Sequence, residues 1–105
     1  MTTLNTGQTI YETIISVDRL NNPVLAPNFS AGTIVTLNGE VTTGTTVAFE
    51  LKDSTYGIFM TSWSADTYGT YQITVKNAVT NVIYVSDNYR IVADSDVDAV
   101  VYVGI

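Results

Sequence analysis

Cysteine and histidine are both absent from this 105-residue chain. Without cysteine there is no disulfide framework, no zinc knuckle and no thiol nucleophile. Without histidine the chain lacks the commonest general base and metal ligand, so its serines have no imidazole to activate them. The lysines that a Ser–Lys pair would need, Lys52 and Lys76, fall on strand positions that alternation turns toward solvent. We therefore expect no catalytic residues, no cofactor and no enzymatic activity.

Basic residues are scarce as well. Four Lys and Arg stand against ten Asp and Glu, which gives a net charge of −6. Binding to nucleic acid takes clustered Lys and Arg that neutralise phosphates, so we expect no nucleic-acid partner. No window approaches the roughly 18 consecutive apolar residues that a membrane helix requires, and no membrane partner is expected. The first eight residues have neither a basic nor an apolar region, which predicts no signal peptide.

What the chain has in abundance is β-branched residues: Thr, Val and Ile make up 40 of the 105. These side chains disfavour helix and suit a pleated, half-buried surface. Period-two alternation recurs along the whole sequence. In the first segment Tyr11, Thr13, Ile15 and Val17 share one face, while Glu12 and Ser16 face away. Further short strands are predicted around 33–37, 40–43, 47–52, 58–64, 71–76, 81–86, 88–93 and 97–103.

Turn residues separate these segments. Asn38-Gly39 is the strongest two-residue hairpin signal, and Asp53–Gly57 is typical of a turn. Short strands spaced about 8–12 residues apart with turns between them favour an antiparallel sandwich or barrel. We predict an all-β fold, an antiparallel β-sandwich of about seven to nine strands. Residues 9–105 would form this single domain, and residues 1–8 a separate N-terminal arm.

Two segments stand outside the strand pattern. The polar arm contains Leu4, and the longest connection, Asn21–Gly32, contains both prolines of the chain. That connection is either a structural crossover, in which Leu25 and Phe29 close the end of the core, or a contact loop. Under the second interpretation the candidate contact residues are Leu4, Pro23, Leu25, Pro27 and Phe29.

The segment from Asp66 to Val75 resembles the corner that precedes the penultimate strands of immunoglobulin-like domains. Asp66, Gly69 and Tyr71 match the D-x-x-G-x-Y pattern of that corner, in which the tyrosine hydroxyl bonds to upstream backbone. The resemblance implies an immunoglobulin-like sandwich with these three residues as its structural corner. The cysteine pair of antibody domains is absent, and Trp63 lies too close to Tyr71 for the antibody spacing.

Short, acidic, cysteine-free chains of this kind, rich in Thr, Val and Ile, resemble accessory virion proteins of tailed bacteriophages. The resemblance covers the segment from Thr9 to Asp18 and Asn22-Pro23-Val24, and it is one of type rather than of an exact motif. It implies a structural component of a virion's capsid, neck or tail, assembled in the host cytoplasm. Its partners would be other copies of itself or other virion structural proteins.

Two further interpretations remain open. Asp94, Asp96 and Asp98 space three carboxylates like the first ligands of a calcium loop, but the glycine and glutamate that such a loop needs later are Ala99 and Ile105. An acidic turn that keeps the last hairpin soluble is the other explanation, so we predict no metal site. The second interpretation is a module that binds a carbohydrate, such as a host-surface glycan, through exposed aromatic rings. Its candidate rings are Tyr56, Trp63, Tyr68, Tyr84, Tyr89 and Tyr102.

Overall fold

The computed structural model describes residues 1–93, and over this range the chain is all-β with one short 3-10 helix. The elements are β1 (Thr2–Asn5), β2 (Ile10–Ile15), η1 (Phe29–Gly32), β3 (Thr33–Leu37), β4 (Glu40–Thr42), β5 (Ala48–Asp53), β6 (Ile58–Trp63), β7 (Gly69–Lys76), β8 (Ile83–Val85) and β9 (Tyr89–Val92). The all-β class predicted from the sequence is confirmed. The strand expected over 97–103 lies outside the described residues.

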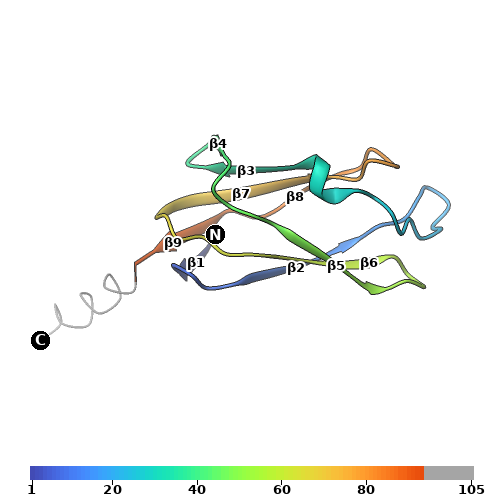
Figure 1. The fold of residues 1–105 in the computed structure, drawn as a ribbon, viewed down its shortest axis with the longest axis horizontal. Coiled ribbons are helices and arrows are strands. Elements are labelled where there is room, and N and C mark those ends of the chain that lie inside the picture. Colours follow the sequence, from blue (N-terminus) through green and yellow to red (C-terminus); the bar gives the residue numbers. More distant parts are fainter. Residues whose placement is uncertain (94–105) are drawn as a thin grey trace, which may run out of the picture.

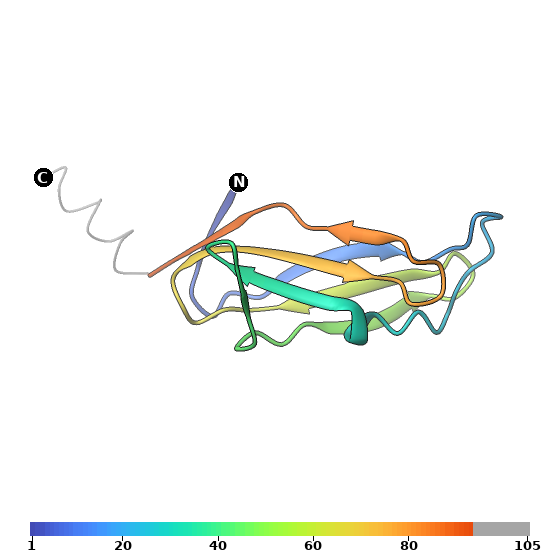
Figure 2. The same cartoon turned by 90° about the horizontal axis from the view of Figure 1, so that it is seen from above.

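The strands form two sheets that face each other as two layers (Figure 1). One sheet has the order β1-β9-β7-β3-β4, with β8 also pairing with β7, and the other has the order β2-β6-β5. All pairs are antiparallel except β1 with β9, which is parallel. The view from above shows β7 and β3 crossing over the strands of the second layer (Figure 2).

The N-terminal residues are part of a sheet and do not form the separate arm that their polarity predicts. Thr2–Asn5 pairs in register with Tyr89–Val92, and Leu4 is half-buried against the core. Backbone pairing stabilises such a segment without any apolar alternation in its sequence. Residues 2–5 of the predicted arm are therefore held by a sheet partner about 87 positions away, which no local pattern reveals.

The Asn38-Gly39 hairpin between β3 and β4 is confirmed. Leu37 pairs with Glu40, and both turn residues have positive φ, 53° at Asn38 and 85° at Gly39. This is the backbone that a two-residue type I′ turn needs, and Asn and Gly tolerate it best. The turn also contacts the start of β7, since the Asn38 backbone N–H donates to the Thr70 carbonyl at 2.7 Å.

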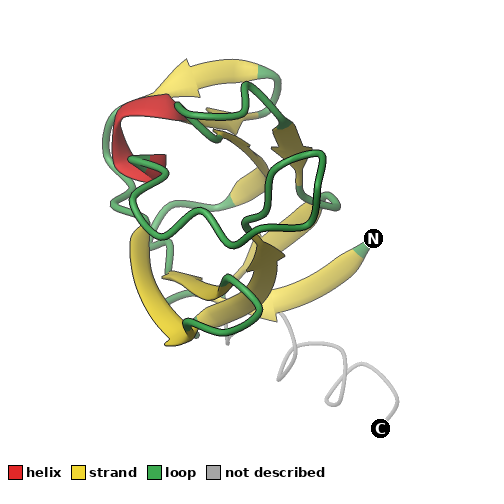
Figure 3. Ribbon diagram, turned by 90° about the vertical axis from the view of Figure 1, so that its right-hand side faces the viewer, coloured by secondary structure: helices red, strands yellow, loops and turns green. Residues whose placement is uncertain are grey.

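The core lies between the two sheets and is closed at one end by the long connection. Its buried side chains come from both sheets, from the β6–β7 loop and from η1: Ile10, Ile14, Phe29, Val35, Phe59, Trp63, Ala65, Tyr71, Ile73, Val75 and Ile91. Phe29 is buried among aromatic rings, 5.2 Å from the Phe59 centroid and 5.3 Å from that of Phe49. Figure 3 looks onto this end of the sandwich, where η1 and the connecting loops lie.

The inward face of β2 is the one that carries Glu12 and Ser16. Ile10, Ile14 and Ser16 are buried, whereas Tyr11, Thr13 and Ile15 are exposed. The sequence pattern therefore separates the two faces of β2 correctly, and the face with Tyr11 and Ile15 is the one that points to solvent. Because strand side chains have a period of exactly two, this choice fixes the position of every residue of the strand.

Candidate functional site

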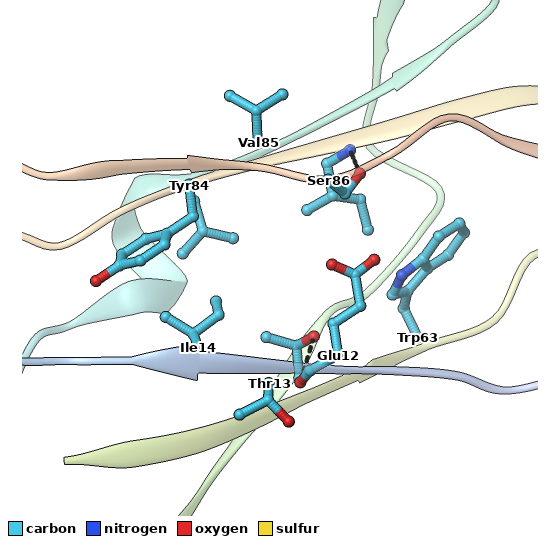
Figure 4. A pocket seen from close by; sticks show the side chains of 10 residues that line it. Glu12, Thr13, Ile14, Trp63, Tyr84, Val85 and Ser86 are labelled. Atoms are coloured by element: carbon cyan, nitrogen blue, oxygen red, sulfur yellow. Dashed lines mark hydrogen bonds between the residues drawn. The ribbon is translucent and has the colours of Figure 1, made fainter. Parts of the chain in front are cut away.

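A recess of about 180 Å³ opens between the sheets beside β2, and one acidic side chain lies in it (Figure 4). Glu12 projects from β2 toward the opposite sheet, between Trp63 and Ser86. Its carboxylate accepts a hydrogen bond from the Tyr89 hydroxyl at 2.6 Å. The Tyr89 ring packs edge-on against Trp63, with 5.6 Å between the centroids. The carboxylate is thus held by a strand of the other sheet.

The electrostatics of this pair suit a fixed hydrogen bond. Burial raises the pKa of Tyr89 to about 12, and the hydrogen bond to Glu12 with the charges of Glu12 and Asp87 acts in the same direction. The phenol therefore stays neutral, and a donor, at ordinary pH. Glycoside hydrolysis needs two carboxyl groups across a cleft, and Glu12 is the one acid among the described residues that line this recess. The arrangement is that of a structural hydrogen bond that links the two sheets.

Tyr84 makes a second hydrogen bond to β2 from the other sheet. Its hydroxyl donates to the Ile15 carbonyl, and its ring is 6.2 Å from Phe29 in an edge-on arrangement. Burial raises the pKa of Tyr84 above its ordinary value. Both Tyr84 and Tyr89 therefore point between the sheets, and neither joins an exposed aromatic platform. Tyr102 lies outside the described residues, and Trp63 is buried in the core.

The outer face of the three-stranded sheet carries an apolar strip. On β2 the exposed side chains include Tyr11 and Ile15, 64% and 54% exposed, and on β6 Ile58 and Met60 point the same way because they pair with Ile15 and Thr13. Tyr56, 66% exposed, continues this surface in the turn before β6. We call this surface the apolar strip and define it by six residues: Tyr11, Ile15, Val17, Tyr56, Ile58 and Met60.

At one end of the strip the surface is hollowed into a shallow groove. It is lined by residues from β2, the following turn, the β5–β6 turn and the start of β6: Ile15, Val17, Asn21, Thr55, Tyr56 and Ile58. Most of this lining is apolar. Asp18 holds the adjacent turn, because its carboxylate accepts backbone N–H bonds from Leu20 and Asn22 at 2.8 and 2.9 Å. The hydrogen bond from the Asn22 backbone N–H is the main cause that keeps the pKa of Asp18 below its ordinary value.

The three corner residues lie at the start of β7. Tyr71 is 2% exposed, and its hydroxyl donates to the Thr67 carbonyl at 3.0 Å. Gly69 has a φ of 140°, and a Cβ there would come within 2.6 Å of the Leu37 side chain. Asp66 is exposed. The corner is therefore built from Tyr71, which needs a partner for a buried phenol, and from Gly69, which lets the β3–β4 turn approach.

The five candidate contact residues are not brought together on one surface. Pro27 and Phe29 are buried and Leu4 is half-buried, whereas Pro23 and Leu25 are exposed. The Pro27 carbonyl accepts a hydrogen bond from the Ala78 N–H at 2.8 Å, so this part of the connection is structural. The expectation that Leu25 closes the core together with Phe29 was wrong for Leu25, which is 47% exposed.

The acidic triplet Asp94, Asp96 and Asp98 lies outside the described residues. Over residues 1–93 no group of three or more acidic side chains is placed so that it could hold a metal ion. No helix in that range is long and apolar enough to cross a membrane.

A buried polar network under the long connection is not predicted by the sequence pattern. Ser16 and Asn77 are both fully buried, and the Asn77 Nδ2 donates to the Ser16 Oγ at 3.0 Å. Ser16 in turn donates to the Val24 carbonyl, and the Asn77 Oδ1 accepts the backbone N–H groups of Val79 and Thr80. The only local signal was that Asn77 directly follows a predicted strand, which is common for a turn residue.

No protein-family model matches the sequence, and none of the curated proteins or solved structures matches the chain.

Proposed function

We propose that this chain is a non-catalytic assembly component, an accessory structural protein of a tailed-phage virion that docks through the outer face of its three-stranded sheet. The observation that carries this proposal is the apolar strip. Scattered exposed apolar residues are ordinary on a protein surface, but a contiguous group is typical of an interaction site. Tyr11, Ile15 and Tyr56 are each more than half exposed and share this face with Ile58 and Met60.

The fold that we propose for this role is immunoglobulin-like. The order β2-β6-β5 opposite β9-β7-β3-β4 corresponds to the two sheets of such a sandwich, with its first strand paired to the last instead of to the second. The hydrogen bond from Tyr71 to the Thr67 carbonyl, at the start of β7, supports the same assignment. Fold alone does not carry function, so the assembly role rests on the surface.

The charge of the chain favours apolar contacts. A net charge of −6 opposes self-association by electrostatics, and the strip itself carries no charged side chain. Glu50 and Lys52, the charged residues of β5 on this side, pair with each other at 3.1 Å. A partner would therefore bury Tyr, Ile and Met side chains at the centre of the contact, with β5 at its polar rim.

Co-sedimentation with phage particles tests the role. Particles are assembled with the wild-type chain, with Ile58→Lys in the strip, or with Val85→Lys on the outer face of the other sheet, and are purified on a density gradient. We expect the wild type and Val85→Lys to band with the particles, and Ile58→Lys to stay in the soluble fraction. If the wild-type chain is absent from the particles, the proposed role is wrong.

The exposed rings of Tyr11, Tyr56 and Tyr68 support carbohydrate binding as a second function. They come from a strand, a turn and a loop, and only Tyr11 and Tyr56 belong to the strip. A glycan array that retains the wild type and not Tyr56→Ala would favour this function over assembly. If the wild type binds no glycan on the array, the carbohydrate function is ruled out.

A further inference from the structure

The five strands that lie at sheet edges in residues 1–93 differ in how they are protected against pairing with another chain. The edges at β1, β4 and β8 are short, with four, three and three residues. The edge at β5 has six residues, but it carries Glu50 and Lys52 and a register shift between Leu51 and Asp53. Short length, charge and a bulge are the usual devices that keep an edge unpaired.

β2 is a six-residue edge without those surface devices. It pairs with β6 on one side, and no other described strand pairs with it. Its solvent-facing side chains, Tyr11, Thr13 and Ile15, are uncharged, and the strand contains no proline and shows no register shift. Its single charge, Glu12, points inward, and an inward charge can itself protect an edge. Here the Tyr89 hydroxyl donates to the Glu12 carboxylate at 2.6 Å, so a second strand at the edge would not leave this charge without a partner.

The direction of the backbone groups identifies which residues of β2 are free to pair. The Ser16 N–H donates toward β6, to the Gly57 carbonyl at 2.7 Å. Because successive residues of a strand direct their N–H and C=O groups to opposite sides, Tyr11, Thr13 and Ile15 direct theirs to the open edge. The Ile15 carbonyl also accepts the Tyr84 hydroxyl, and a carbonyl oxygen has a second lone pair for another donor.

We propose that the open edge of β2 pairs antiparallel with β2 of a second copy, around a twofold axis at Thr13. This register places Tyr11 opposite the second copy's Ile15, and an aromatic residue opposite a β-branched one is a favourable cross-strand pair. It forms a ladder of about six backbone hydrogen bonds and joins the two three-stranded sheets into one. A register centred on Glu12 would place two carboxylates opposite each other, which is unfavourable.

The pairing also makes the apolar strip continuous across two copies. Tyr11 and Ile15 lie at the edge, with Met60 and Ile58 behind them on β6. The joined surface is twice as wide and shares one face, because the twofold axis that pairs two antiparallel edges keeps their outer sides together. This inference deepens the proposed assembly function, on which it rests, by naming a second copy as one partner.

Sedimentation velocity over a concentration series tests the pairing. Thr13→Pro removes the central donor of each copy, and proline is tolerated where a strand N–H faces away from its own sheet. We expect a dimer for the wild type and a dissociation constant raised about tenfold or more for Thr13→Pro. Thr13→Lys, which leaves the backbone intact, should weaken the dimer in the same direction. Thr3→Lys, at the exposed edge of the other sheet, is the matched control and should dimerise like the wild type.

The outcomes separate the edge from other modes of association. A wild-type dimer that both Thr13 variants leave intact overturns the pairing, and so does a wild type that stays monomeric at millimolar concentration. If the wild type is a monomer and deletion of residues 94–105 makes the β2 amides exchange faster, that segment occupies the edge. This result also overturns the pairing. Ile58→Lys should still dimerise, because it lies on β6 and not at the edge. A chain that bands with particles but never dimerises would therefore refute the pairing and leave the assembly function standing.

Discussion

Removal of the Tyr71 hydroxyl isolates the contribution of the corner before β7. In Tyr71→Phe the ring keeps its packing against Trp63, at 5.6 Å between centroids, and only the 3.0 Å hydrogen bond to the Thr67 carbonyl is lost. Thr67 is an exposed residue, so water can reach its carbonyl once the loop relaxes. The cost should then be close to the net worth of one hydrogen bond, about 1 kcal/mol.

Urea denaturation measures this cost directly. With a slope of about 1–3 kcal/mol per molar urea, the midpoint should fall by about 0.3–1 M at unchanged slope. The melting temperature of a domain of this size should fall by about 4–8 °C. Tyr56→Phe, which removes the hydroxyl of a tyrosine that is 66% exposed, is the control and should leave the midpoint unchanged. Equal midpoints for Tyr71→Phe and the wild type would refute the structural role of the corner.

Three further predictions concern the turns and ties of the fold. Gly57→Ala should lower the free energy of unfolding by about 3 kcal/mol or more, since its Cβ would lie 2.1 Å from a backbone carbonyl oxygen. Gly7→Ala, also at positive φ but with open space around it, should lower it by only about 1 kcal/mol, and thermal melts compare the two variants. Asn77→Ala should cost about 2–4 kcal/mol through its lost buried hydrogen bonds, and an unchanged urea midpoint would contradict the network. The pKa of Tyr89, about 12, exceeds the unfolded value near 10. The stabilisation by its neutral form is therefore complete below pH 10 and lost as pH rises through 12. Glu12→Gln should lower that pKa in a tyrosine-ring NMR titration, and an unmoved value would show that the carboxylate has no part in it.

The parts of the fold that could be predicted from the sequence are those that depend on neighbouring residues. Asn38 and Gly39 form the β3–β4 turn because their own backbone preferences allow positive φ at both positions. The strands β6 and β7 follow the alternation of their own side chains, with Phe59, Thr61 and Trp63 buried on one face of β6. Local propensity and the global fold agree in these segments.

The inward face of β2 could not be predicted because it depends on distant partners. Glu12 and Ser16 share the inward face with the core residues Ile10 and Ile14. Tyr89 and Asn77, 77 and 61 positions away, supply the hydrogen bonds of the two polar side chains. A polar residue is expected at the surface unless such a partner exists. The same limit applies to β1, whose strand character comes entirely from its pairing with β9. The apolar strip lies on the opposite, outward face of this strand, so alternation alone could not assign it to the surface.

Hydrogen exchange tests the central claim that the chain assembles through its three-stranded sheet, at the open edge of β2. Amide exchange would be measured by NMR on the dilute chain and on its assembled form. We expect assembly to protect the amides of Tyr11, Thr13 and Ile15, which face the open edge, and to leave the exposed edge of β1 unchanged. Protection gained at β1, β4 or β8 with none at β2 would contradict it.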